Sequence, residues 1–224
     1  MKKLVIKDNP TIRKKVYNYV REQILSGEVG PNERLIENKI AKEIGTSRTP
    51  VREALHSLEM EGLIESIPRV GYMVKTLSDQ EAVELWEIRS LIEGLAARWA
   101  VEKAHDKLVR ELRKNIALAE ERVAQGDVAA FVELDGQFHE IIARLSGGTR
   151  LLELSQMLRR HALRYRLHSI NTPDTALRAI EGHRAILRAV ETGDPEQISL
   201  TIKSHLEQSK EDTLRYAFKE EQRS

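Results

Sequence analysis

Three histidines and one aspartate in the second half of the chain have the types and spacing of metal ligands. Asp135 and His139 are four residues apart in "ELDGQFHEII", so a helix would carry both on one face. His183 and His205 continue the apolar stripes of two further stretches, "ALRAIEGHRAILRAV" and "ISLTIKSHLEQS". Imidazole and carboxylate groups together are a suitable ligand set for zinc, nickel, manganese or iron.

The same four side chains also have a simpler interpretation, as hydrogen-bonded residues of a helical core. Burying a polar group costs free energy unless the group is paired or binds a metal. Periodicity cannot show that three helices converge on one point, so both interpretations stay open from the residues alone. The chain has no cysteine, which excludes disulfides and thiolate metal sites and indicates a reducing, cytoplasmic setting.

A second set of candidate residues lies in "GTSRTPVREALHSLEMEGLIES", residues 45–66. Arg48 and Arg52 are four apart at the start of a predicted helix, opposite an apolar stripe. The major groove of DNA admits one helix, and arginine binds guanine O6 and N7 there with two hydrogen bonds. The hydroxyls of Ser47 and Thr49 at the helix start suit phosphates. The alternative is a solvated helix face on which Arg52 pairs with a neighbouring glutamate.

The helices that would position these arginines are predicted from apolar periodicity. Three stretches carry such a stripe: residues 12–27, 35–44 and 47–62. Two short β-prone runs then flank "PRVG", which predicts a hairpin. Helix, tight turn, helix and β-ribbon is the order of a winged helix-turn-helix. Arg69 and Gly71 lie at the tip of the predicted ribbon, where they permit close approach to the DNA backbone or minor groove.

The chain from Ser78 onward has the pattern of an all-helical domain. Helix-start signals recur along it, at Ser78, Asp127, Thr172 and Asp194. About six helices are predicted, the first ending near Ala104 and the second beginning shortly after it.

The predicted fold class is therefore mainly α, in two domains. Residues 1–76 form a winged helix-turn-helix domain, and residues 77–224 form an all-α helical bundle. The basic excess of the chain lies at its start and an acidic excess lies in the remainder, which suggests two parts with different partners, although a difference this small also arises by chance. No apolar run approaches the roughly 18 residues of a membrane helix, so we expect no membrane partner.

The first domain also resembles a known family. The segment "ERLIENKIAKEIGTSRTPVREALHSLEMEGLIESIPRVGYMV" is similar to the winged-helix domain of GntR-family transcription regulators, a likeness that covers residues 10–76. The resemblance implies that Arg48 and Arg52 contact operator bases or adjacent phosphates, supported by Ser47, Thr49, Arg69 and Gly71. Many relatives have arginine where this chain has Asn38. Asparagine can contact adenine or phosphate but carries no charge, so Asn38 is a weaker DNA-binding candidate.

Residues 79–220 resemble the FCD domain, the all-helical ligand domain of the FadR subfamily. The motifs that carry the likeness are "DGQFH", "HRAILRAVETGD" and the final "HL". The helix count resembles the shorter, VanR-like branch. The resemblance implies a metal centre with four ligands: Asp135, His139, His183 and His205. We expect zinc first, with nickel, manganese or iron as alternatives.

A metal that accepts five or six ligands would have room for an effector carboxylate beside four protein ligands. An arginine could bind the same carboxylate as a bidentate pair. Arg89 matches an arginine common in the family, and Arg160 and Arg164 lie on a predicted middle helix. Arginines on helices are usually solvated, and that interpretation stays open for all three.

The expected function is a homodimeric, cytoplasmic transcription regulator that acts as a repressor. A small acidic metabolite would bind the metal-containing domain and change the affinity for double-stranded operator DNA. A dimer is expected because two recognition helices match two half-sites. The alternatives are a metal-dependent hydrolase and a DNA-binding regulator with a purely structural metal. The sequence shows no nucleophile motif, phosphate loop or spare carboxylate placed as a general base, so we expect no enzyme.

Overall fold

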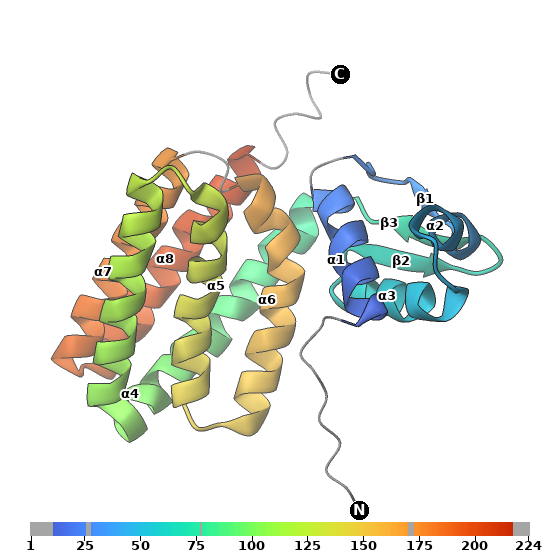
Figure 1. The fold of residues 1–224 in the computed structure, drawn as a ribbon. Coiled ribbons are helices and arrows are strands. Elements are labelled where there is room, and N and C mark those ends of the chain that lie inside the picture. The colour runs from blue at the N-terminus through green and yellow to red at the C-terminus, as the bar shows by residue number, and fades with distance from the viewer. Residues whose placement is uncertain (1–10, 26–27, 77, 170–172, 217–224) are drawn as a thin grey trace, which may run out of the picture. The chain divides into compact units, whose positions relative to one another are not determined.

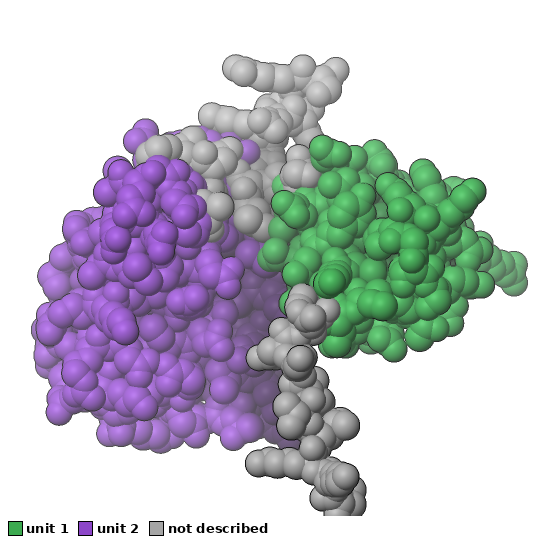
Figure 2. Space-filling view, viewed as in Figure 1, with its two compact units in different colours: residues 1–76 green, residues 77–224 purple. Residues whose placement is uncertain are grey.

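A computed structural model describes four ranges of the chain: residues 11–25, 28–76, 78–169 and 173–216. Five side chains inside these ranges are not described: Ala129, Arg164, Leu167, His168 and Pro173. The chain divides into two compact units, residues 1–76 and residues 77–224, which Figure 2 shows in separate colours. The predicted helix cap Thr172 lies outside the described residues. Within the described ranges, no helix has both the length and the apolar character needed to cross a membrane.

Three helices and a small antiparallel sheet form the first unit (Figure 1). The helices are α1 (Ile12–Leu25), α2 (Glu37–Ile44) and α3 (Arg48–Met60), and the strands are β1 (Arg34–Leu35), β2 (Ile64–Ile67) and β3 (Gly71–Val74). The strand order is β1-β3-β2. The apolar stripes of the helices meet in one core, whose fully buried residues include Val16, Val51, Ala54, Leu55 and Leu58. The first unit therefore has the predicted winged helix-turn-helix order.

Strand β1 corrects the predicted helix over residues 35–44. Leu35 pairs with Tyr72 of β3, so the helix begins two residues later, at Glu37, and Ile36 stays exposed. The ribbon predicted with two strands is consequently a sheet of three. A two-residue strand is too short to show the alternation of polar and apolar side chains by which strands are predicted.

Five helical elements form the second unit: α4 (Asp79–Ala124), α5 (Val128–Leu145), α6 (Thr149–Ser169), α7 (Pro173–Thr192) and α8 (Pro195–Tyr216). Helix α4 packs against each of the other four. Its backbone is non-helical at Ala104, with φ −152° and ψ 33°, so α4 consists of two helical segments. The unit thus contains the six segments that the sequence predicts, with the break where it was expected.

Side-chain caps begin three of these helices at the predicted residues. Ser78 accepts a hydrogen bond of 3.3 Å from the N–H three residues later, and Asp127 accepts one of 3.0 Å from the same relative position. Asp194 accepts a bond of 2.9 Å from the N–H two residues later. Each cap satisfies a backbone donor that a helix leaves unpaired in its first turn. The caps fix where α4, α5 and α8 begin, and hence which side chains face the core.

Candidate functional site

Helices α5, α7 and α8 bring three of the four predicted metal ligands together in the core of the second unit. One ring nitrogen each of His139, His183 and His205 lies within 4.8 Å of the others. The three side chains are at most 7% exposed. Their ring centroids are 4.9–5.3 Å apart. The convergence that periodicity could not establish is therefore a property of the fold.

Close packing fixes two of the three rings. Phe138 stacks on His183, with 3.8 Å between the ring centroids and 7° between the ring planes. His205 lies directly against the backbone of Gly182, since a Cβ placed on Gly182 would be 2.2 Å from its Nδ1. The orientation of these rings is thus set by the shapes of their neighbours.

Ring nitrogens of the cluster lack hydrogen-bond partners among the described residues. Both ring nitrogens of His183 and the Nε2 of His205 are buried and make no hydrogen bond within the described part of the chain. Burial, reinforced by a neighbouring histidine, lowers the pKa of His183 and of His205 well below the usual value. Both rings are therefore neutral at pH 7, which is the form of imidazole that binds a divalent ion.

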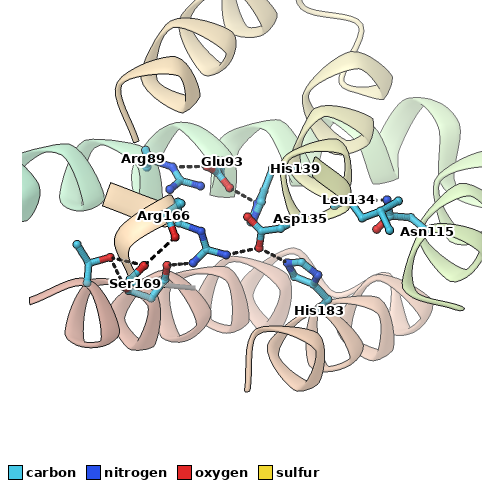
Figure 3. Close-up of polar contacts among 11 residues, drawn as sticks. Arg89, Glu93, Asn115, Leu134, Asp135, His139, Arg166, Ser169 and His183 are labelled. Carbon is cyan, nitrogen blue, oxygen red and sulfur yellow. Dashed lines mark hydrogen bonds and ion pairs between the residues drawn. The ribbon is translucent and has the colours of Figure 1, made fainter. Parts of the chain in front are cut away.

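Asp135, the fourth predicted ligand, lies beside the cluster but is bonded mainly to Arg166. Its Oδ1 is 3.5 Å from His183 Nε2 and accepts a hydrogen bond from Arg166 (Figure 3). Arg166 also donates to Ser209 Oγ at 2.5 Å. Burial alone would raise the pKa of Asp135, but Arg166 and the neighbouring histidines bring it below the ordinary value. Asp135 is therefore an ionised carboxylate beside His183.

A second buried carboxylate contacts the cluster from α4. Arg89 donates to Glu93 at 2.9 Å, and the other carboxylate oxygen of Glu93 is 2.6 Å from His139 Nδ1 (Figure 3). Burial alone would raise the pKa of Glu93, but Arg89 and His139 lower it below its ordinary value. A carboxylate in this position orients the imidazole of a metal-binding histidine.

Glu93 and Arg166 contact the cluster without having been predicted from the sequence, whereas three other arginines were predicted. Arg89 is buried and is hydrogen-bonded to Glu93, which in turn contacts the cluster, while Arg160 is exposed on α6. The side chain of Arg164 lies outside the described residues. The i,i+4 spacing from Arg89 was an available signal for Glu93. Arg166 has no local signal, because its two partners are 31 and 43 residues away in the sequence.

A pocket of about 390 Å³ opens beside the cluster, between α6, α7 and α8. Its volume lies within the roughly 300–1,000 Å³ range of small-molecule sites. Arg166 and His205 belong both to the wall of this pocket and to the buried cluster. Arg89 and Arg160 are not among its wall residues. The pocket therefore offers a small molecule a route to one histidine and one arginine of the buried cluster, His205 and Arg166.

The contact between Gly182 and His205 leads to a first prediction. We expect Gly182→Ala to displace His205, to weaken metal retention and to destabilise the protein by about 1–3 kcal/mol, as overpacking does in a core. The measurements are thermal unfolding and elemental analysis of the purified protein. Gly136→Ala on α5 is the matched control, because its added Cβ would meet only an arginine nitrogen at 4.0 Å. Alanine usually stabilises a helix relative to glycine, so equal behaviour of the two variants contradicts the proposed contact.

The predicted DNA-binding side chains lie on the surface of the first unit. Arg48 and Arg52, on α3, are 58% and 59% exposed. Ser47, Thr49 and Asn38 are exposed at the starts of α3 and α2. Ser47 occupies the N-cap position of α3, but its side chain makes no capping hydrogen bond. The Ser47 hydroxyl therefore does not cap α3.

Glu37 of α2 accepts hydrogen bonds from both of the α3 arginines predicted to bind DNA. Arg52 donates to its two carboxylate oxygens at 2.8 and 2.9 Å, and Arg48 donates to one of them at 3.1 Å. The hydrogen bond from Arg52 is the main cause that lowers the pKa of Glu37. The glutamate that pairs with Arg52 thus comes from the preceding helix, not from α3 itself.

The turn between β2 and β3 places the predicted wing residues. Arg69 is exposed there and has a left-handed φ of 66°. Gly71 has a φ of 110°, and a Cβ on it would lie 3.3 Å from the carbonyl oxygen of Leu35. Glycine at this position is therefore explained by the close approach of β1 as well as by the backbone angle.

Two family models match the chain. "Bacterial regulatory proteins, gntR family" matches residues 12–74, and "FCD domain" matches residues 84–208.

Known proteins similar to this chain include named repressors. The chain is 32% identical over 197 residues to the "Probable D-xylose utilization operon transcriptional repressor" of Paenarthrobacter nicotinovorans, covering 88% of this chain and 86% of that protein. It is 26% identical over 208 residues to the "HTH-type transcriptional repressor RspR" of Escherichia coli (strain K12), covering 91% and 90%. The solved structure "E. coli McbR/YncC" matches with a TM-score of 0.74 and 23% identity, covering 92% and 98%, which shows a shared fold.

Proposed function

Because the chain belongs to the gntR family of bacterial regulatory proteins, which are DNA-binding transcription regulators, we propose that it is a repressor controlled by a small carboxylate. Repression is supported by the names of the two relatives above. The carboxylate would bind in the second unit, at a divalent ion held by His139, His183 and His205 with Asp135 beside them. Zinc is the first candidate for this ion, followed by nickel, manganese and iron.

One observation carries the proposal. Buried imidazole nitrogens that make no hydrogen bond within the described ranges lie directly beside a pocket large enough for a small molecule. Buried nitrogens without hydrogen bonds cost free energy, and a bound ion would satisfy them. When bound there, a divalent ion supplies an electrophilic centre for a carboxylate oxygen. His205 connects this centre to the pocket wall, and Arg166 lies in the same wall as a positive charge for the acid.

The test begins with protein purified without added metal, examined by elemental analysis. Operator sequences are then selected from a random duplex library, and DNA affinity is measured with and without a panel of carboxylic acids. The proposal expects about one divalent ion per chain and an acid that changes operator affinity only in the metal-loaded protein. In thermal unfolding, an acid at a hundredfold excess over its Kd should add about 2.7 kcal/mol of stability. An ion that is retained while no acid changes stability or DNA binding would leave the metal a purely structural role.

We also propose that the protein acts as a homodimer. Helix α4 exposes Leu91 to 75%, with exposed Ile88 one turn earlier, and large apolar residues exposed together often mark association surfaces. Light scattering at micromolar concentration should give twice the chain mass of 25.6 kDa, and Leu91→Arg should shift the mass toward that of one chain. A wild-type protein that is monomeric at this concentration contradicts the dimer and the twofold operator with it.

A further inference from the structure

Glu37 occupies a fixed position at the start of α2. It is the first residue of the helix, where the N-terminal end of the helix dipole favours a negative charge. Two residues earlier, Leu35 is buried and pairs with Tyr72 of β3, which fixes the backbone that leads into the helix. The hydrogen bond from Arg52 is the main cause that lowers the pKa of Glu37, whose side chain is 17% exposed. Glu37 is therefore an ionised acceptor that can orient the donors bound to it.

The two hydrogen bonds from Arg52 to Glu37 occupy one edge of the guanidinium group. Nε donates to Oε1 at 2.8 Å, and Nη2 donates to Oε2 at 2.9 Å. A guanidinium carries five N–H groups in one plane, so both hydrogens of Nη1 and one of Nη2 remain. Arg52 makes no other hydrogen bond within the described part of the chain, and its side chain is 59% exposed. The end of the guanidinium, formed by Nη1 and Nη2, is therefore available as a pair of parallel donors.

A pair of parallel donors matches one base better than the others. Guanine presents two acceptors, O6 and N7, to the major groove, whereas adenine presents one acceptor beside a donor and cytosine presents a donor. An arginine that is free to turn can also offer its donors singly to phosphates, which carry no sequence information. Immobilising such a side chain at a base costs less when a carboxylate already holds it. The contact with Glu37 thus favours a guanine at the end of Arg52.

Arg48 has a looser contact with the same carboxylate. Only its Nη2 donates to Glu37, at 3.1 Å, so its guanidinium can still turn about that one bond. The backbones of the two arginines are equally fixed, because Val51 and Leu55 of the same helix are fully buried. The difference between Arg48 and Arg52 therefore comes from Glu37, and a strict base preference is expected of Arg52.

We infer that Glu37 is a positioning residue for base recognition. By binding the Nε–Nη2 edge of Arg52, it directs the Nη1–Nη2 end to O6 and N7 of one guanine in the operator half-site. Glu37 acts through the arginine and need not touch the DNA itself. The inference rests on the DNA binding of the family, with α3 as the recognition helix, and it is independent of the proposed ion and carboxylate.

The test measures base preference as well as affinity. An operator is selected from a random duplex library with the full-length wild-type protein. Each of its guanines is replaced in turn by adenine, with the paired base changed to match, and by 7-deazaguanine, which lacks the N7 acceptor. Binding is measured by fluorescence anisotropy at fixed salt. The guanine assigned to Arg52 is the one whose replacement no longer matters in Arg52→Ala.

Glu37→Gln is the decisive variant, because it keeps the shape of the side chain but replaces one acceptor oxygen with a donor. At the assigned guanine, replacement by adenine should weaken wild-type binding by roughly 5- to 150-fold. The loss in Glu37→Gln should be at least about threefold smaller, for adenine and for 7-deazaguanine alike. Combining Glu37→Gln with Arg52→Ala should change the base preference no further than Arg52→Ala alone. Thermal unfolding should show that the variant keeps the stability of the wild type.

Three further variants separate positioning from charge. Glu43→Gln removes a negative charge from the same helix, where its carboxylate accepts a hydrogen bond from Tyr19, and it should keep the guanine preference. Arg48→Ala should bind the operator more weakly but keep the preference at this guanine. Arg52→Lys keeps the charge but lacks the second donor edge, so it should lose the preference although Glu37 is intact.

The other outcomes overturn the inference in distinguishable ways. If Glu37→Gln keeps the full guanine preference, Glu37 acts through its charge alone and positions nothing. If every guanine stays as important in Arg52→Ala as in the wild type, Arg52 does not recognise a base, while operator binding itself still stands. If the wild type binds selected and unrelated duplexes equally, the operator recognition on which the inference rests fails as well.

Discussion

Replacing His183 with alanine is expected to weaken metal retention at least 10- to 100-fold and to lower the free energy of unfolding by about 2–5 kcal/mol. His183 is fully buried, stacks on Phe138 and lies beside Asp135, so its removal leaves a cavity and takes away a neighbour of the carboxylate. The response to carboxylates should vanish. Basal operator binding should partly remain, because the first unit has a hydrophobic core of its own.

Elemental analysis after gel filtration, thermal unfolding and DNA titration measure these three effects. His183→Gln is a second variant that keeps most of the side-chain volume, so it should lose the ion with a smaller loss of stability. His105→Gln, a half-exposed histidine of α4 outside the cluster, is the control and should keep the ion. Full metal occupancy and a normal carboxylate response in His183→Ala would refute the site. If metal-free wild-type protein still responds normally to the carboxylate, the four residues keep their role in the response, but the ion has none.

The second large effect is expected at the recognition helix. Arg48→Ala and Arg52→Ala should each weaken operator binding by about 1–3 kcal/mol, which is roughly 5- to 150-fold in affinity. Both side chains are more than half exposed, so the fold should survive either change. Arg52 should show the larger effect, because it alone makes two hydrogen bonds to Glu37 and is the more firmly oriented of the two.

Fluorescence anisotropy at one fixed salt concentration, with operator and unrelated duplexes, measures this prediction. Lys42→Ala on α2 removes an exposed positive charge elsewhere on the same unit and serves as the control. If both arginine variants bind the operator as tightly as the wild type, α3 is not the recognition helix. If they lose affinity equally for both duplexes, the arginines contact phosphates and not bases.

Most of the fold was predictable because its signals are local. The caps at Ser78 and Asp127 and the break near Ala104 depend on residues a few positions apart, and all three lie where the sequence placed them. Strand β1 was missed because its partner is β3, far along the chain, and pairing of two residues leaves no periodic trace. A strand this short, which forms only by pairing with a distant segment, cannot be predicted from the spacing of apolar residues.

The same distinction explains the site. The inward positions of His139, His183 and His205 follow from the apolar stripes around them, so their burial was predictable. Their meeting at one point depends on how three helices pack, which the residues alone left open and the family resemblance implied. Glu93 and Arg166 join the cluster from two further helices, and neither helix has a pattern that distinguishes a buried charge from a solvated one.

The hydrogen bonds from Arg48 and Arg52 to Glu37 bear on how the protein would find its operator among the unrelated sequences of a genome. A protein binds random DNA mainly by releasing counterions from phosphates, and each phosphate contact adds about 0.9 to the slope of log affinity against log salt. A carboxylate that occupies two guanidinium groups reduces the positive charge that α3 offers to any phosphate it meets. With α3 as the predicted recognition helix, we therefore expect shorter encounters with unrelated DNA. A larger share of the protein would then be free to bind the few sites whose base edges Arg48 and Arg52 are predicted to contact.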